Sequence, residues 1–100
     1  MAKLVALYKQ PEDKRAFDDH YFNVHAPLTE KIPGLTEMKV TTFTGTPMGK
    51  ESPYYLMCEM TYNSMDDLKK GMGSDEGKAS GKDLMSFAGN LVTLMISEEQ

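Results

Sequence analysis

The fold is decided by one stretch near the middle of the chain, Tyr54 to Tyr62, which reads YYLMCEMTY. Its aromatic and apolar residues begin after Pro53 and end before Asn63, a pattern that predicts a β-strand. Successive side chains of a strand point to opposite faces. One face would carry Leu56, Cys58, Met60 and Tyr62, and the other Tyr55, Met57, Glu59 and Thr61. Because both faces are mainly apolar, we expect helices to cover the first face and a further surface to cover the second.

The segments around this stretch complete a pattern of strands and helices. Strands are predicted at Lys3 to Lys9, Leu35 to Gly45 and Leu91 to Ser97, and helical regions at Pro11 to Ile32 and Ser64 to Ala88, the latter restarting at Ser74. We expect a break in the first helix at Pro27, because the residue before a proline avoids helical geometry. The order predicts an α+β fold, the ferredoxin-like βαββαβ pattern with a four-stranded antiparallel sheet, as a single domain over residues 1–100.

Composition excludes several classes of protein. The 100 residues include 15 acids and 11 bases, and the only adjacent lysines are Lys69 and Lys70, so we expect no nucleic-acid partner. The lone cysteine, Cys58, cannot form an intrachain disulfide and fits a reducing cytoplasm. The longest apolar run, Leu4 to Leu7, is far shorter than the roughly 20 residues of a membrane span, so we expect no membrane partner and no targeting segment.

Both faces of the first and last predicted strands are also apolar. Val5 and Leu7 alternate with Leu4, Ala6 and Tyr8, and Val92, Leu94 and Ile96 alternate with Leu91, Thr93 and Met95. An uncovered apolar sheet face is rare on a monomer. We therefore expect a second copy of the chain to cover this face in a two-fold homodimer. The space between the two sheets would be filled or left as a pocket for an apolar or aromatic small molecule.

His25 is the first candidate for chemistry. It lies near a helix end beside Pro27, where the helix dipole favours the imidazolium and a side chain can project into a cleft as acid or base. The alternative is a capping histidine bonded to a nearby carbonyl. His20 would lie about 140° away on a continuous α-helix. We therefore interpret it as a half-buried surface residue and expect no metal site.

Glu59 is the second candidate catalytic residue, because it stands alone among apolar neighbours. Burial without a charged partner would raise its pKa and prepare it for general acid or base catalysis, whereas in another register it is a solvent-facing charge. Lys31 is the third candidate, and Tyr8 and Tyr55 would be polar companions that contact the ligand. The remaining predicted ligand contacts are Leu28, Met57 and Met95. Cys58 is expected to be inert in the core, since no base or helix N-terminus activates it.

Two stretches carry a resemblance to a known family. Tyr21 to Leu35 reads YFNVHAPLTEKIPGL, and further along SDEGK at Ser74 to Lys78 precedes DLMSF at Asp83 to Phe87. Together they resemble the EthD family of small dimeric α/β-barrel proteins, named after a component of ethyl tert-butyl ether degradation. Length and element order agree along the whole chain. The resemblance implies that the sheets of two ferredoxin-like subunits pair to form the barrel, and it includes His25, Leu28 and Lys31 among the family-pattern positions.

The resemblance leaves several functions open. Relatives on this barrel include cofactor-free monooxygenases, lactone isomerases, polyketide cyclases and haem enzymes, and fold analogy does not choose among them. We expect a small-molecule-binding protein of oxidative degradation that needs no cofactor. It would act as a monooxygenase-like oxidoreductase or an accessory component of the degradation, or as an isomerase or cyclase, with His25 as acid or base. The alternative is a non-catalytic carrier of hydrophobic ligands or an interaction module, and a third hypothesis is haem binding with His25 as the axial ligand.

Overall fold

The computed structural model describes all 100 residues and has the predicted ferredoxin-like α+β fold. Four strands form one antiparallel sheet in the order β2-β3-β1-β4. They are β1 (Ala2–Lys9), β2 (Leu35–Thr42), β3 (Tyr54–Tyr62) and β4 (Val92–Glu98). The helical elements are α1 (Lys14–His20), the π-helical turn η1 (Tyr21–His25), α2 (Ala26–Glu30), α3 (Met65–Gly73) and α4 (Asp75–Ala88). None of these helices has the length and apolar character that crossing a membrane requires.

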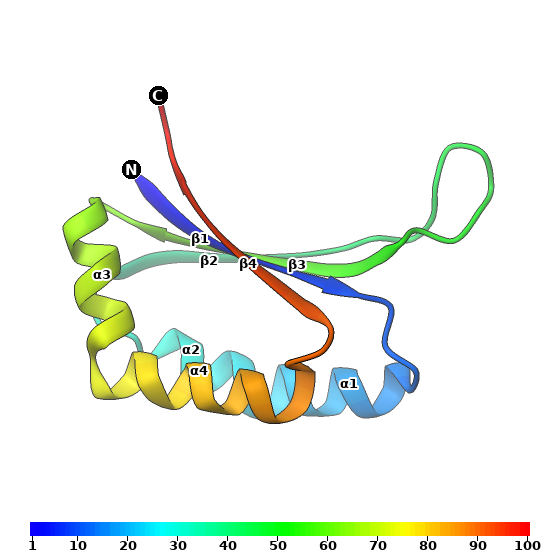
Figure 1. Ribbon diagram of the computed structural model, residues 1–100, viewed down its shortest axis with the longest axis horizontal. Coiled ribbons are helices and arrows are strands. Elements are labelled where there is room, and N and C mark those ends of the chain that lie inside the picture. Colours follow the sequence, from blue (N-terminus) through cyan, green and yellow to red (C-terminus); the bar gives the residue numbers. More distant parts are fainter.

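The helices form a layer that covers a single face of the sheet (Figure 1). In this view α1, α2 and α4 lie below the sheet, α3 stands at one end, and the connection between β2 and β3 projects at the other. No element lies over the opposite face, which we call the free face. Cross-strand register places on it Val5, Leu7, Met57, Glu59 and Met95. The free face is the surface for which the sequence predicts a second cover.

The core lies between the sheet and the helices. It contains the four residues that alternation predicted for the helix side of β3: Leu56, Cys58, Met60 and Tyr62. Tyr55 is predicted for the opposite side, but in the structure it contacts helix α1. Its ring packs against Phe17 of α1 with centroids 5.5 Å apart, and its hydroxyl donates to the Asp18 carboxylate at 2.9 Å. The register between β1 and β3 shifts beside Tyr55, and such a bulge redirects a side chain.

Side-chain caps set the helix boundaries. α1 begins at Lys14 rather than at the predicted Pro11, because Asp13 is the N-cap and accepts a hydrogen bond from the backbone of Ala16 at 3.0 Å. The predicted restart at Ser74 is confirmed: its hydroxyl accepts from a backbone N–H of the next turn and begins α4 at an angle to α3 (Figure 1). The second helical region is therefore two helices that meet at one capping serine.

The predicted break at Pro27 is wrong. The backbone stays helical through His25 and Ala26, and the π-helical turn η1 precedes the proline. In this turn the Ala26 N–H bonds to the carbonyl of Tyr21, five residues back. The wide turn ends two residues before Pro27, which lacks an N–H, and it lets the helix continue in a changed register. The changed register decides which side chains share a helix face, and the functional site depends on it.

Candidate functional site

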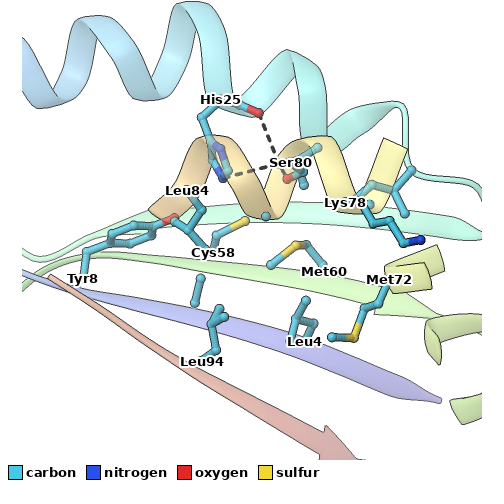
Figure 2. Close-up of a pocket in the computed structure, with 15 residues that line it drawn as sticks. Leu4, Tyr8, His25, Cys58, Met60, Met72, Lys78, Ser80, Leu84 and Leu94 are labelled. Carbon is cyan, nitrogen blue, oxygen red and sulfur yellow. Dashed lines mark hydrogen bonds between the residues drawn. The ribbon is translucent and has the colours of Figure 1, made fainter. Parts of the chain in front are cut away.

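A cavity of about 250 Å³ lies between the sheet and the helices. Its apolar wall comes from the sheet, α3 and α4, and includes Leu4, Met60, Met72, Leu84 and Leu94. Figure 2 shows Leu4 and Met60 on the sheet side of this space and Leu84 on the helix above it. The cavity therefore lies on the helix-covered face, whereas the sequence predicted a ligand pocket on the free face, between two paired sheets.

Polar groups gather at one part of the cavity wall. His25 of η1, Thr29 of α2 and Ser80 of α4 line it together, and all three are buried. Tyr8, which is 1% exposed, reaches in from β1, and Figure 2 shows it below His25 and beside Cys58. These side chains come from separate elements of the fold. An apolar space with a few convergent polar groups is the usual form of a small-molecule site.

The π-helical turn brings His20 and His25 to the same side of the helix. Residues five apart diverge on an α-helix, but the π-helix repeats its hydrogen bonds at i and i+5. Both imidazoles accordingly reach one carboxylate, Asp83 of α4. Nε2 of His20 lies 2.8 Å from Oδ1 of Asp83, and Nδ1 of His25 lies 3.0 Å from Oδ2. The prediction that the two rings point apart is wrong, because it assumed an α-helical turn.

Asp83 determines which nitrogen of His25 carries the hydrogen. An ionised carboxylate only accepts hydrogen bonds, so the His25 ring must donate from Nδ1. Nε2 then carries a lone pair. The side chains of His25 and Asp83 are 8% and 15% exposed, so little water competes for this bond. The ring is therefore held with its basic nitrogen away from the carboxylate.

The hydroxyls beside Nε2 have closer partners than this nitrogen. Oγ1 of Thr29 lies 2.7 Å from Oγ of Ser80 and 3.1 Å from the carbonyl oxygen of His25, but 3.4 Å from Nε2. In the arrangement that uses the two shorter distances, Ser80 donates to Thr29 and Thr29 donates to the carbonyl. Each hydroxyl has one hydrogen, so both are then used. In this arrangement the lone pair on Nε2 is available to a molecule in the cavity.

Burial sets the ionisation of the groups around the cavity. It lowers the pKa of His25, against the opposing effect of Asp83, so the ring is a neutral base at pH 7. Burial raises the pKa of Tyr8, with smaller effects from Cys58 and Asp83, so the phenol keeps its proton. Burial also raises the pKa of the Cys58 thiol, which agrees with the prediction of an inert core cysteine.

A neutral base and a protonated phenol thus border one apolar space. Nε2 of His25 can accept a proton from a bound molecule, and Tyr8 can donate a hydrogen bond to an oxygen that becomes negative. Exclusion of water strengthens both interactions. No three histidine, cysteine or carboxylate side chains are grouped as a metal site requires. The chemistry available to these residues is acid–base chemistry.

The structure separates the residues predicted for catalysis. Glu59 lies on the free face and pairs with Lys3 at 3.4 Å, so it does not meet His25 within one subunit. Lys31 is exposed at the end of α2. Among the predicted ligand contacts, Tyr8 lines the cavity. The others lie outside its lining, and their role as ligand contacts stays a prediction: Tyr55, Leu28, Met57 and Met95.

Sequence reasoning missed three residues of the site, Asp83, Thr29 and Ser80. Asp83 opens the DLMSF stretch, one of the two that carry the family resemblance, so a signal for it was present. Thr29 follows His25 by four residues, which is one helical turn. Ser80 has no comparable signal, because it meets the others only through the packing of α4 against α2 and η1.

Comparison with known proteins identifies the family. The EthD domain matches residues 9–90, which is most of the chain. The chain belongs to the EthD family. It is 66% identical to an EthD family protein from Bacillus halodurans C-125, whose crystal structure matches with a TM-score of 0.96 over 100% of this chain and 99% of that one. The resemblance inferred from the two sequence stretches is confirmed.

Two further proteins are less similar to this EthD protein. The uncharacterized 11.0 kDa protein of the thcB-thcC intergenic region in Rhodococcus erythropolis is 27% identical over 103 residues, covering 100% of this chain and 96% of that protein. A dimeric protein of unknown function with a ferredoxin-like fold from Bacteroides fragilis NCTC 9343 has 17% identity and a TM-score of 0.65, covering 98% and 95%. At that identity the likeness shows the fold alone. The reaction must be argued from the site.

Proposed function

We propose that this EthD protein is an acid–base enzyme that acts on a small apolar or aromatic compound with a hydroxyl group, in the oxidative degradation of such compounds. One observation carries the proposal: the neutral, buried His25 presents Nε2 at an apolar cavity that Tyr8 also lines. His25 would take the proton of the bound hydroxyl. Tyr8 would donate a hydrogen bond to the oxyanion that forms.

The size of the cavity supports a compound of one or two rings. Its volume is about 250 Å³, and an engineered apolar cavity of roughly 150 Å³ in another protein binds benzene. Mostly apolar walls with polar groups in one part suit a ligand with one polar end. Removal of a proton makes such a compound electron-rich. This step would serve a cofactor-independent oxidation as well as an isomerisation or cyclisation.

Two probes of matched shape test the proposal, 4-nitrophenol and nitrobenzene, which lacks the hydroxyl, both at a mildly acidic pH at which 4-nitrophenol keeps its hydroxyl hydrogen. We expect saturable binding of both to the wild-type protein in titration calorimetry, with one site per chain. His25→Leu removes the acceptor for the hydroxyl. It should weaken 4-nitrophenol about tenfold, the effect of one hydrogen bond of about 1.4 kcal/mol, and leave nitrobenzene within about twofold.

The outcomes separate the enzyme from the alternatives. No saturable binding of either probe would overturn the proposed ligand site. Unchanged 4-nitrophenol binding in His25→Leu would remove the proposed role of His25 and favour a non-catalytic carrier. Equal weakening of both probes would indicate a collapsed cavity, and Tyr8→Phe, which removes one hydroxyl from the same part of the wall, then provides the comparison.

We also propose that a second copy of the chain covers the free face. Val5, Leu7 and Met57 lie there without a covering element, and Met95 is 43% exposed. The related structure from Bacteroides fragilis is described as dimeric. We expect a dimer in sedimentation velocity at micromolar concentration, and dissociation in Met57→Lys, because a charge in an apolar interface is unfavourable. A monomeric wild-type protein would contradict the proposal.

A further inference from the structure

The Asp83 carboxylate is hydrogen-bonded to a histidine on each side. The outer one, His20, has no part in the proposed function. Nε2 of His20 lies 2.8 and 3.1 Å from the two carboxylate oxygens, and Nδ1 of His25 lies 3.0 Å from Oδ2. Side-chain exposure increases along this path, from 8% for His25 to 15% for Asp83 and 33% for His20. The network therefore runs from the cavity wall to the protein surface.

We propose that His20 is a positioning residue: it holds the carboxylate of Asp83, which keeps the hydrogen of His25 on Nδ1 and Nε2 free toward the cavity. The inference rests on the proposed function, in which Nε2 of His25 is the base. His20 does not line this cavity and borders a separate outer hollow near the start of α1. It would act on the ligand only through Asp83 and His25.

The carboxylate needs this second partner to keep one orientation. His20 is the residue that bonds to Oδ1 of Asp83. Without it the carboxylate would turn about the Cβ–Cγ bond, a torsion with broad minima. The two neutral forms of an imidazole are chosen by the hydrogen bond that one nitrogen makes. A carboxylate that changes its orientation would favour the Nδ1–H form of His25 less strongly.

Packing holds His20 in place. Its ring lies on Phe87 with centroids 4.4 Å apart and an interplanar angle of 32°. Phe87 follows Asp83 by one turn of α4, and its ring also lies 5.2 Å from that of His25. One aromatic side chain therefore restricts the rotation of both imidazoles. His20 is half-buried, as the sequence indicated, and this packing also fixes the orientation of its ring.

Few other ionisable groups face His25. Three of them are Tyr8 on β1, Tyr21 on the helical turn that carries His25, and Cys58 on β3. Burial raises the pKa of each, so all three are uncharged at neutral pH. Lys78 lines the cavity from α4 but is exposed. The ionisable group in direct contact with the His25 ring is therefore Asp83, through which His20 acts, and the uncharged hydroxyl of Thr29 lies farther away, 3.4 Å from Nε2.

NMR of the imidazole rings tests the proposal without a ligand, so failure here is distinguishable from failure of the proposed function. The chain has two histidines, and ¹⁵N shifts of a labelled sample at alkaline pH report which nitrogen carries the hydrogen. We expect wild-type His25 in the Nδ1–H form. His20→Leu should give a mixture of the two forms. His20→Gln, whose amide can still donate to Asp83, should restore the Nδ1–H form.

A His25 that remains wholly Nδ1–H in His20→Leu would overturn the proposal, as would a wild-type ring in the Nε2–H form. Probe binding gives a second readout. The ratio of 4-nitrophenol to nitrobenzene affinity should fall about threefold in His20→Leu and recover in His20→Gln, about 0.7 kcal/mol of lost preference. An unchanged ratio would count against positioning. If His20→Leu does not fold, His20→Ala provides the same comparison.

Discussion

Protonation of His25 should destabilise the folded protein below neutral pH. The residue is only 6% exposed, and burial lowers its pKa. In the unfolded chain the ring has its ordinary pKa of about 6.5. As the pH falls through this value, the unfolded chain binds a proton that the folded chain resists, so the free energy of unfolding decreases.

The size of the effect has a ceiling. One proton changes the free energy of unfolding by at most about 1.4 kcal/mol per pH unit. The contribution is fully present above roughly pH 6.5, decreases below it, and levels off once the pH is below the folded-state pKa of His25. For a domain near this length, 1 kcal/mol corresponds to about 4–8 °C in Tm. We therefore expect a loss of at most roughly 1 kcal/mol between about pH 6.5 and 5.5.

Urea unfolding at three pH values, about 7.5, 6.5 and 5.5, measures this dependence. His25→Gln removes the titrating ring while keeping an amide donor for Asp83, and its stability should vary less with pH in this window. His20→Gln is the matched control, because it removes the other histidine of the chain. Parallel curves for the wild type and His25→Gln would refute the reasoning, since burial would then not keep the His25 ring neutral.

Four further substitutions follow from the packing. Gly71→Ala should lower stability by about 1–3 kcal/mol in thermal unfolding, because a Cβ there lies 2.9 Å from the Pro33 carbonyl and 3.0 Å from the Tyr62 ring. Gly81→Ala meets nothing within 4 Å and should instead stabilise α4 by about 0.5–1 kcal/mol; equal effects at the two glycines would contradict this. Gly81 also lines the cavity, so Gly81→Leu should weaken 4-nitrophenol at least about tenfold, and retained binding would place the ligand elsewhere. Ser64→Ala removes the N-cap of α3 and should lower stability by about 1 kcal/mol; an unchanged Tm would show that the cap is dispensable.

Much of the fold could be predicted from local patterns. Alternation assigned Leu56, Cys58 and Met60 to the buried side of β3, and the structure agrees, because the direction of a strand side chain follows from backbone geometry. Ser74 was identified as a helix start for a similarly local reason, since its hydroxyl bonds to the backbone a few residues ahead. The family pattern is also a continuous run of sequence. Alternation failed at Tyr55, where a shift in the pairing with β1 redirects the ring.

By itself, the sequence determined the order of strands and helices and the apolar faces of the sheet, and it indicated His25 as a candidate residue. Only the tertiary structure decided which side chains His25 contacts. The bond between His25 and Asp83 joins residues 58 positions apart, and it forms because the π-helical turn rotates both histidines toward α4. The turn and the packing of α4 place these side chains together, and such long-range contacts leave no local periodicity to read. The same packing puts the cavity on the helix side of the sheet and leaves Glu59 on the other face.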